Sequence, residues 1–174
     1  IADKTICQGD SVNLIATGAS TYGWTPGNGV GDIYSGNTWV KPVTTLNTTT
    51  PINYIVTGTK TYCSDKDTVK ITVDNYKNFA NAGVDVGFCK TPAATANVQL
   101  GASFANTYFW TPNYNIIAGG QSSPVPKVAP DVDTFYVLRA TRGVCVGYDT
   151  VKVKVDDYKN FANAGADTFI CMGN

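Results

Sequence analysis

The side chains with the clearest chemistry in this 174-residue chain are five cysteines that recur at a fixed interval. Cys7, Cys89 and Cys171 follow one another every 82 residues, and Cys63 and Cys145 are also 82 residues apart. Cysteines that repeat in small units indicate disulfides made in an oxidising compartment. Zinc is not favoured, because no two cysteines are close in sequence and the chain has no histidine.

Each copy of the repeat holds two cysteines 56 residues apart, which predicts the disulfides Cys7–Cys63 and Cys89–Cys145. Closing a loop of that size adds about 4 kcal/mol to stability in the chain-entropy model. Cys171 stands in a third copy where Cys7 and Cys89 stand in the first two. Its partner is therefore expected outside this segment, either further along a longer polypeptide or in another subunit.

Oxygen-bearing side chains gather at the two boundaries between copies, and all 13 acidic residues of the chain are aspartates. Hard oxygen ligands at a domain boundary suit Ca²⁺, which would stiffen a tandem array. The alternative is that they are ordinary turn and capping residues at strand ends. The candidate ligands are Asp74, Asn75 and Asp85 at the first boundary, and Asp156, Asp157 and Asp167 at the second.

Composition argues against several function classes. Without histidine the chain cannot form a Ser–His–Asp or Cys–His site, and no glycine-rich phosphate loop follows a strand. The net charge is zero and there is no basic run, so nucleic acid is a poor partner. No apolar stretch approaches the roughly 20 residues that a membrane span needs. The sequence predicts a segment that is not an enzyme.

The cysteine interval reflects a tandem duplication, which is typical of repeat architectures. The segment 76–83 reads Tyr-Lys-Asn-Phe-Ala-Asn-Ala-Gly and recurs unchanged at 158–165, although the bodies of the copies differ much more. A flexible tether tolerates many sequences, so this identity predicts a fixed geometry between neighbours; recent duplication is the alternative. The expected division is repeat 1 at 1–76, a junction at 77–83, repeat 2 at 84–158, a junction at 159–165, and the start of repeat 3 at 166–174.

Apolar residues alternate with polar ones over short segments, which predicts strands with one buried face. The clearest strands are expected around 12–16, 22–24, 54–56 and 69–73, and around 98–102, 108–110, 136–138 and 151–155. The lack of glutamate and the abundance of threonine also favour strands over helices. Trp24 and Trp110 are expected in the core. Trp39 has no counterpart in copy two and is the better candidate for an exposed aromatic, although a packed edge residue is the default expectation. Together these features predict all-β, tandem immunoglobulin-like β-sandwich domains.

One order of motifs recurs along the chain. It is Asn-Ala-Gly-x-Asp, a Cys, Val-x-Leu-x-Ala, Tyr-x-Trp-Thr-Pro, a variable loop, a second Cys and Asp-Thr-Val. This order resembles the tandem immunoglobulin-like (PKD-like) repeats of large Bacteroidetes cell-surface adhesins, including SprB-like gliding-motility adhesins, over the whole chain. The resemblance implies a secreted, non-catalytic stalk or fibre segment at the cell surface. It also implies export by the type IX system, and neighbouring repeats of the same chain as partners.

Two further hypotheses follow from particular residues. Ser11, Thr68 and Thr150 lie in Asp-Ser/Thr-apolar triplets, which resemble the O-glycan acceptor of exported Bacteroidetes proteins; the alternative is an ordinary strand start. Loops around Tyr34 and Trp39 are candidates for contact with polysaccharide or another surface. The function predicted is therefore a structural stalk, with a binding module or a subunit of a self-assembling filament as alternatives.

Overall fold

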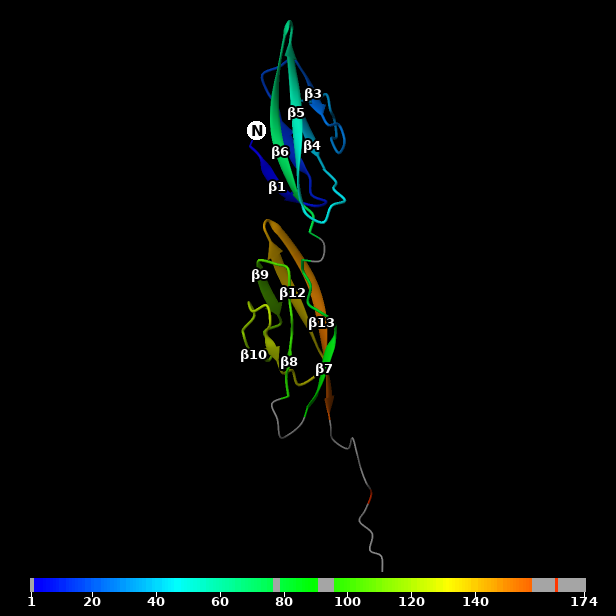
Figure 1. Cartoon of the computed structure of the whole chain (residues 1–174), viewed down its shortest axis with the longest axis vertical. Coiled ribbons are helices and arrows are strands. Elements are labelled where there is room, and N and C mark those ends of the chain that lie inside the picture. Colours follow the sequence, from blue (N-terminus) through cyan, green and yellow to red (C-terminus); the bar gives the residue numbers. More distant parts are fainter. Residues whose placement is uncertain (1, 77–78, 91–95, 158–164, 166–174) are drawn as a thin grey trace, which may run out of the picture.

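The computed structural model describes residues 2–76, 79–90, 96–157 and 165, and these residues form strands and no helix. Two β-rich units follow one another along the long axis of the molecule (Figure 1). The first unit contains β1 (Lys4–Cys7), β2 (Val12–Ile15), β3 (Thr21–Thr25), β4 (Asn37–Val40), β5 (Thr49–Lys60) and β6 (Cys63–Asp74). The second contains β7 (Val86–Lys90), β8 (Val98–Gln99), β9 (Thr107–Thr111), β10 (Ile116–Ala118), β11 (Lys127–Val128), β12 (Thr134–Arg142) and β13 (Cys145–Asp157).

Each unit is a sandwich of two sheets. The larger sheet has the order β1-β6-β5-β3 in the first unit and β7-β13-β12-β9 in the second. The smaller sheets are β2-β4 and β10-β11-β8. Neighbouring strands are antiparallel, except that β1 runs parallel to β6 and β7 runs parallel to β13. The predicted all-β, tandem immunoglobulin-like fold is confirmed.

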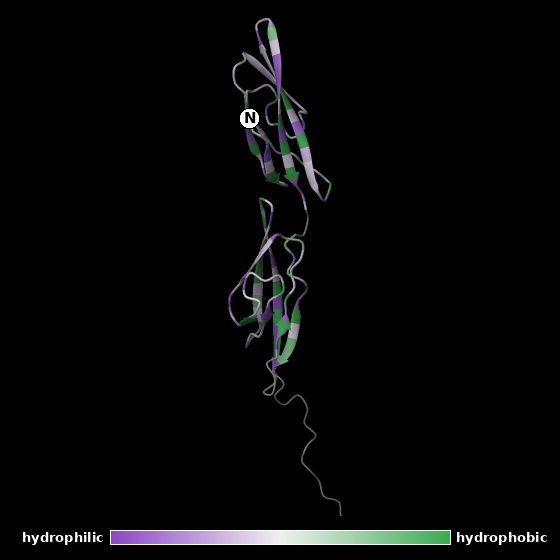
Figure 2. Cartoon of the chain, turned by 60° about the vertical axis from the view of Figure 1, so that its left-hand side comes forward, coloured by the Kyte–Doolittle hydropathy of each residue, from purple (hydrophilic) through white to green (hydrophobic). Residues whose placement is uncertain are grey.

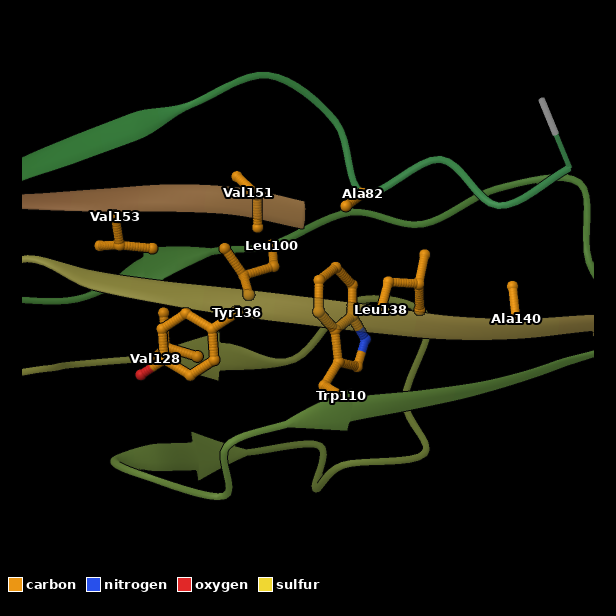
Figure 3. Packing of buried hydrophobic residues seen from close by; sticks show 9 residues of the cluster. All are labelled: Ala82, Leu100, Trp110, Val128, Tyr136, Leu138, Ala140, Val151 and Val153. Carbon is orange, nitrogen blue, oxygen red and sulfur yellow. The ribbon is translucent and has the colours of Figure 1, made fainter. Parts of the chain in front are cut away.

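The core of each unit forms where the apolar faces of the two sheets meet. Apolar and polar residues alternate along the long strands, so one face is apolar and the other polar (Figure 2). Trp24 is 2% exposed and Trp110 is 0% exposed, and the indole of Trp110 lies among the packed side chains of the second core (Figure 3). Both indole Nε1 groups donate hydrogen bonds to backbone carbonyls, at 2.8 Å to Ser35 and 2.9 Å to Ser123. Each buried polar atom of these rings is thereby paired.

A buried tyrosine stands at equivalent positions of the two cores. Tyr54 is 1% exposed and Tyr136 is 0% exposed. The Tyr136 hydroxyl donates a 2.6 Å hydrogen bond to the carbonyl of Tyr114, which requires the protonated phenol. Burial raises the pKa of Tyr54, and burial together with nearby Tyr114 raises the pKa of Tyr136 to about 12.

The raised pKa of Tyr136 predicts that stability falls at high pH. An unfolded tyrosine ionises near pH 10, whereas folded Tyr136 holds its proton to about pH 12. Between these values the unfolded state binds fewer protons, so the free energy of unfolding decreases as pH rises; below about pH 10 the contribution is intact. Denaturant unfolding across this range measures the slope. The variant Tyr136→Phe should be less pH-dependent, and an unchanged slope would contradict the assignment.

Candidate functional site

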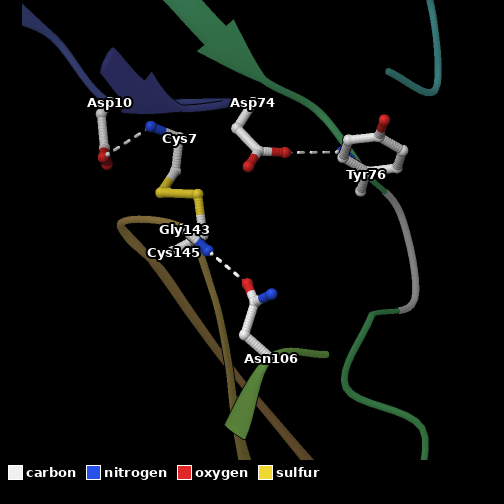
Figure 4. The surroundings of a disulfide bond; sticks show 7 residues. All are labelled: Cys7, Asp10, Asp74, Tyr76, Asn106, Gly143 and Cys145. Atoms are coloured by element: carbon white, nitrogen blue, oxygen red, sulfur yellow. Dashed lines mark hydrogen bonds between the residues drawn. A yellow bond between two sulfur atoms is a disulfide. The ribbon is translucent and has the colours of Figure 1, made fainter. Parts of the chain in front are cut away.

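The joint between the two units is the candidate functional site. On the first unit it comprises Cys7 at the end of β1 together with residues 74–76. On the second it comprises the tip of the β12–β13 hairpin, residues 142–145, and the linker 79–83 that precedes β7. Figure 4 shows the hairpin tip reaching the end of β1. We call these residues the joint.

A disulfide joins the two units. Cys7 and Cys145 are bonded, with 5.6 Å between their Cα atoms and a sequence separation of 138. Cys145 is 4% exposed, so the half of the bond that belongs to the second unit is buried. The free thiols of the described residues are Cys63 and Cys89, and both are exposed. Cys171 lies outside the described residues.

The predicted pairings Cys7–Cys63 and Cys89–Cys145 are therefore wrong. Strand β6 contains 12 residues, begins at Cys63 and ends at Asp74, and Asp74 pairs with Cys7. At about 3.3 Å per residue, the two cysteines of one unit are roughly 36 Å apart. A disulfide needs Cα atoms within about 7 Å. The second unit repeats this separation along β13, so a bond within either unit is excluded by strand length.

A cation–π contact accompanies the disulfide. The guanidinium of Arg142 lies 3.6 Å from the centroid of the Tyr76 ring, so a side chain of the second unit covers an aromatic of the first. Hydrogen bonding to Thr48, and then to Arg142, lowers the pKa of the Tyr76 phenol. Arg142 also donates through Nη1 to the carbonyl of Phe104 at 2.8 Å, which anchors it in its own unit. Arg142 thus contacts both sides of the joint.

The tip of the hairpin fits closely against the end of β6. Gly143 has a φ of 56°, in the left-handed region that favours glycine. Its N–H donates a 2.9 Å hydrogen bond to Oδ1 of Asn106. A Cβ at this position would lie 3.4 Å from Oδ2 of Asp74, which shows how near the two units approach. The hydrogen bond to Asn106 of the second unit fixes the conformation of the tip, and the tip lies against Asp74 of the first unit.

The linker packs on the second unit rather than crossing solvent. Phe79 and Ala80 lie against β13 at Gly147, where a Cβ would come within 3.0 Å and 2.9 Å of their side chains. Ala82 is 1% exposed, and its N–H donates a 2.8 Å hydrogen bond to Oδ2 of Asp149. Both Phe79 and Ala80 join the hydrophobic cluster of the second unit. These contacts give a physical reason for the identity of the two junction sequences.

Closing the space at Gly147 should release the linker. In Gly147→Val the added methyl groups would overlap Phe79 and Ala80, so we expect a loss of about 1–3 kcal/mol in the free energy of unfolding. Gly101→Ala is the matched control, because a Cβ there meets nothing within 4 Å. Chemical denaturation measures both variants. Equal stabilities would show that linker packing contributes nothing.

Two of the candidate calcium ligands, Asn75 and Asp85, form hydrogen bonds that hold parts of the fold. Asn75 is buried, and its Nδ2 donates to the carbonyls of Thr44 and Leu46 at 2.9 and 2.8 Å, which holds the loop before β5. Oδ1 of Asp85 accepts a 2.8 Å hydrogen bond from the N–H of Lys152, which fastens β7 beside β13. Within the part of the chain described, no three His, Cys, Asp or Glu side chains are placed to hold a metal ion.

Calcium at the boundaries therefore stays a prediction. Its remaining candidate ligands among the described residues are Asp74 at the end of β6 and Asp156 and Asp157 at the end of β13. Asp167 lies outside the described residues. The hypothesis predicts that a chelator lowers the melting temperature of protein supplied with Ca²⁺. It also predicts a smaller effect in Asp74→Asn, which keeps the side-chain shape and removes the charge. A melting temperature unaffected by chelator would remove calcium from consideration.

The remaining sequence-predicted sites lie on the surface. Ser11, Thr68 and Thr150 are exposed, and the N–H groups of Thr68 and Thr150 each donate 2.8 Å hydrogen bonds to the preceding aspartate. Glycosylation at these hydroxyls stays a prediction. Trp39 is 59% exposed on β4 and Tyr34 is 75% exposed in the loop before it. The default expectation that Trp39 is a packed edge residue is therefore wrong.

Comparison with known proteins gives the following. No protein-family model matches the sequence, and no curated protein matches it. A solved structure of Drosophila OTK, extracellular domains 3–5, is similar at 10% identity and a TM-score of 0.48, covering 89% of this chain and 59% of that one. The Dscam1 isoform 8.4 structure, its N-terminal four Ig domains, has 12% identity and a TM-score of 0.36, covering 89% and 44%. The Sidekick-1 structure, immunoglobulin domains 1–4, has 14% identity and a TM-score of 0.33, covering 90% and 50%.

This chain thus spans about half the length of those structures. Their low similarity adds no functional argument, and the assignment of the fold rests on the sheets described above. In the described ranges no helix is long and apolar enough to cross a membrane.

Proposed function

We propose that this chain is a structural segment of an extracellular stalk or fibre, in which the joint transmits tension from one unit to the next. The observation that carries the proposal is the Cys7–Cys145 disulfide, because it bonds two separately folded units rather than stabilising one. The Arg142–Tyr76 contact and the packed linker act in the same place. An assembly whose units are bonded and packed end to end holds its direction better than units on free tethers.

The surroundings of the proposed stalk follow from its chemistry. A disulfide between two units persists in an oxidising compartment, which supports a location outside the cytosol. The resemblance of the motif order to the repeats of Bacteroidetes surface adhesins supports a cell-surface adhesin serving adhesion or gliding motility, exported by the type IX system. The proposed role needs no catalysis, which agrees with a chain that has no histidine.

Pulling on the two termini tests the mechanical role. In the reduced protein each unit should unfold with an extension of roughly 250 Å, because about 75 residues lengthen by about 3.4 Å each. In the oxidised protein, tension passes through the Cys7–Cys145 bond and the residues between them cannot extend. Only the strand residues outside that loop, about 15 (4–6 and 146–157), can unfold and lengthen, by roughly 50 Å.

The double variant Cys7→Ser, Cys145→Ser is the control and should behave like the reduced protein. Two long extensions in the oxidised wild-type chain would contradict the proposed path of tension.

A second candidate function is surface binding by the first unit. Trp39 and Tyr34 expose large aromatic faces on neighbouring segments, an arrangement that suits stacking against sugar rings. Binding of an extracellular polysaccharide that is lost in Trp39→Ala would favour this function; silence across a glycan array would count against it.

A further inference from the structure

The end of the first unit that lies away from the joint contains a cavity of about 390 Å³. Its lining includes Ala19, Tyr22, Val56, Gly58 and Asp67. Cys63, with its exposed free thiol, also lines this cavity. The cavity is informative because the corresponding place in the second unit is filled.

Equivalent positions of the two units can be matched through strand register. Val56 pairs with Asp67 in the first unit just as Leu138 pairs with Asp149 in the second. The hydroxyl of Tyr22 donates to the carbonyl of Ala19, and the second unit repeats this hydrogen bond between its counterparts of these residues. The lining residues correspond in turn to Ala105, Tyr108, Leu138, Ala140 and Asp149.

In the second unit this place is occupied by the linker. Phe79 and Ala80 pack against the cluster that contains Leu138 and Ala140. The N–H of Ala82 donates to Asp149. The cavity of the first unit therefore has the shape and the carboxylate acceptor, Asp67, of a site that takes a Phe-Ala-Asn-Ala segment.

One pair of lining residues differs between the units. Gly58 pairs with Asp65 in the first unit, whereas Ala140 pairs with Gly147 in the second. Each pair contains one glycine, but on opposite strands. A Cβ at Gly58 would lie 2.9 Å from the Cβ of Ala19, so the space beside Gly58 is already filled. An incoming linker must therefore pack beside the exposed side chain of Asp65, within the cavity of about 390 Å³.

The hairpin tip beside the cavity resembles the tip in the joint. Lys60 and Thr61 stand where Arg142 and Gly143 stand in the second unit, and Cys63 stands where Cys145 stands. Thr61 has a φ of 46° and Gly143 a φ of 56°, so the two tips share a backbone conformation that is uncommon for threonine. The first unit therefore presents a cation and a cysteine as the second unit does.

The complementary half is present at the other end of the chain. Cys89 pairs with Asp156 near the end of β13, as Cys7 pairs with Asp74 at the end of β6. Cys89 is a free, exposed thiol. The linker sequence also recurs at 158–165, directly after β13.

We propose that the cavity end of the first unit is a docking site for another unit of this same kind. The linker of that unit enters the cavity through its Phe-Ala-Asn-Ala segment, and its cysteine equivalent to Cys7 or Cys89 bonds to Cys63. The proposal deepens the stalk function and rests on it, because it makes the joint a repeated connection. The incoming unit is the second unit of another copy of this chain, because that unit presents Cys89 as a free, exposed thiol and is followed by the same linker sequence.

The bond forms by thiol–disulfide exchange with an organic disulfide such as oxidised glutathione. The two cysteine thiols lose two protons and two electrons and form one S–S bond. The oxidant gains both and is released as two thiols.

The test is assembly of the 174-residue chain carrying Cys171→Ser, incubated with oxidised glutathione. We expect linear species at multiples of 18.5 kDa that collapse on reduction, with peptide mapping showing Cys63 bonded to Cys89 of another molecule. Cys63→Ser should leave only monomers. Asp65→Trp fills the cavity from an exposed position and should slow assembly about tenfold or more, since blocking a buried aromatic anchor removes a dominant contact. Thr68→Trp, exposed on the same strand and outside the cavity, is the matched control.

Three results would overturn the proposal. The first is Cys63 remaining a thiol while Cys7–Cys145 is complete. The second is Cys63–Cys63 pairing as frequent as Cys63–Cys89. The third is an equal rate of assembly in the Asp65→Trp and Thr68→Trp variants. None of them affects the pulling experiment, which depends on Cys7–Cys145 alone.

Electrophoresis of native material with and without reductant tests whether the partner is a separate copy. A fall to single chains after reduction is expected. An unchanged chain mass after reduction would overturn the second copy and place the partner in the same polypeptide.

Discussion

The length of one strand governs the covalent structure of this protein. Strand β6 runs for 12 residues between the two ends of the first unit, and an extended backbone cannot shorten without losing its ladder of hydrogen bonds. The two cysteines of a unit are therefore held at opposite ends and cannot meet. Each is presented outward to a neighbour instead. A disulfide within one unit would stabilise a single sandwich, whereas the disulfide in this structure connects two sandwiches.

The linker follows the same strand, since it comes shortly after the end of β6, and it packs on the second unit. Ala82 is as buried as the core residues around it, and its backbone is bound by Asp149. Tyr76 lies at the start of the same segment under Arg142. The disulfide, the cation–π contact and the packed linker attach the units at separate points, and three separate points define an orientation where a single bond would leave rotation.

Much of the fold could be predicted from the sequence, because alternation reports directly on which residues face a core. The strands around Trp24 and Trp110 and the all-β class follow from it. Strands β1 and β7 were not predicted, because four or five residues are too few to show a regular alternation of apolar and polar side chains. The cysteine pairing was mistaken for a different reason. A repeat interval reveals equivalent positions, but it does not say whether a residue bonds within its unit or across the boundary. The available signal was the connection between the strands expected around 54–56 and 69–73, because a cysteine at a hairpin tip cannot reach the far end of the following strand.

The Cys7–Cys145 bond also closes most of the chain into a covalent ring, with a sequence separation of 138 between the bonded positions. A protease that cuts one peptide bond inside this ring opens it but does not divide the molecule. The two termini stay connected through the sulfur atoms, and the strands on either side of the cut remain held by their neighbours. A protease can then cut an exposed loop, such as the one around Tyr34, without separating the two fragments. The disulfide that joins the two units thus also keeps the chain covalently connected after a single cut.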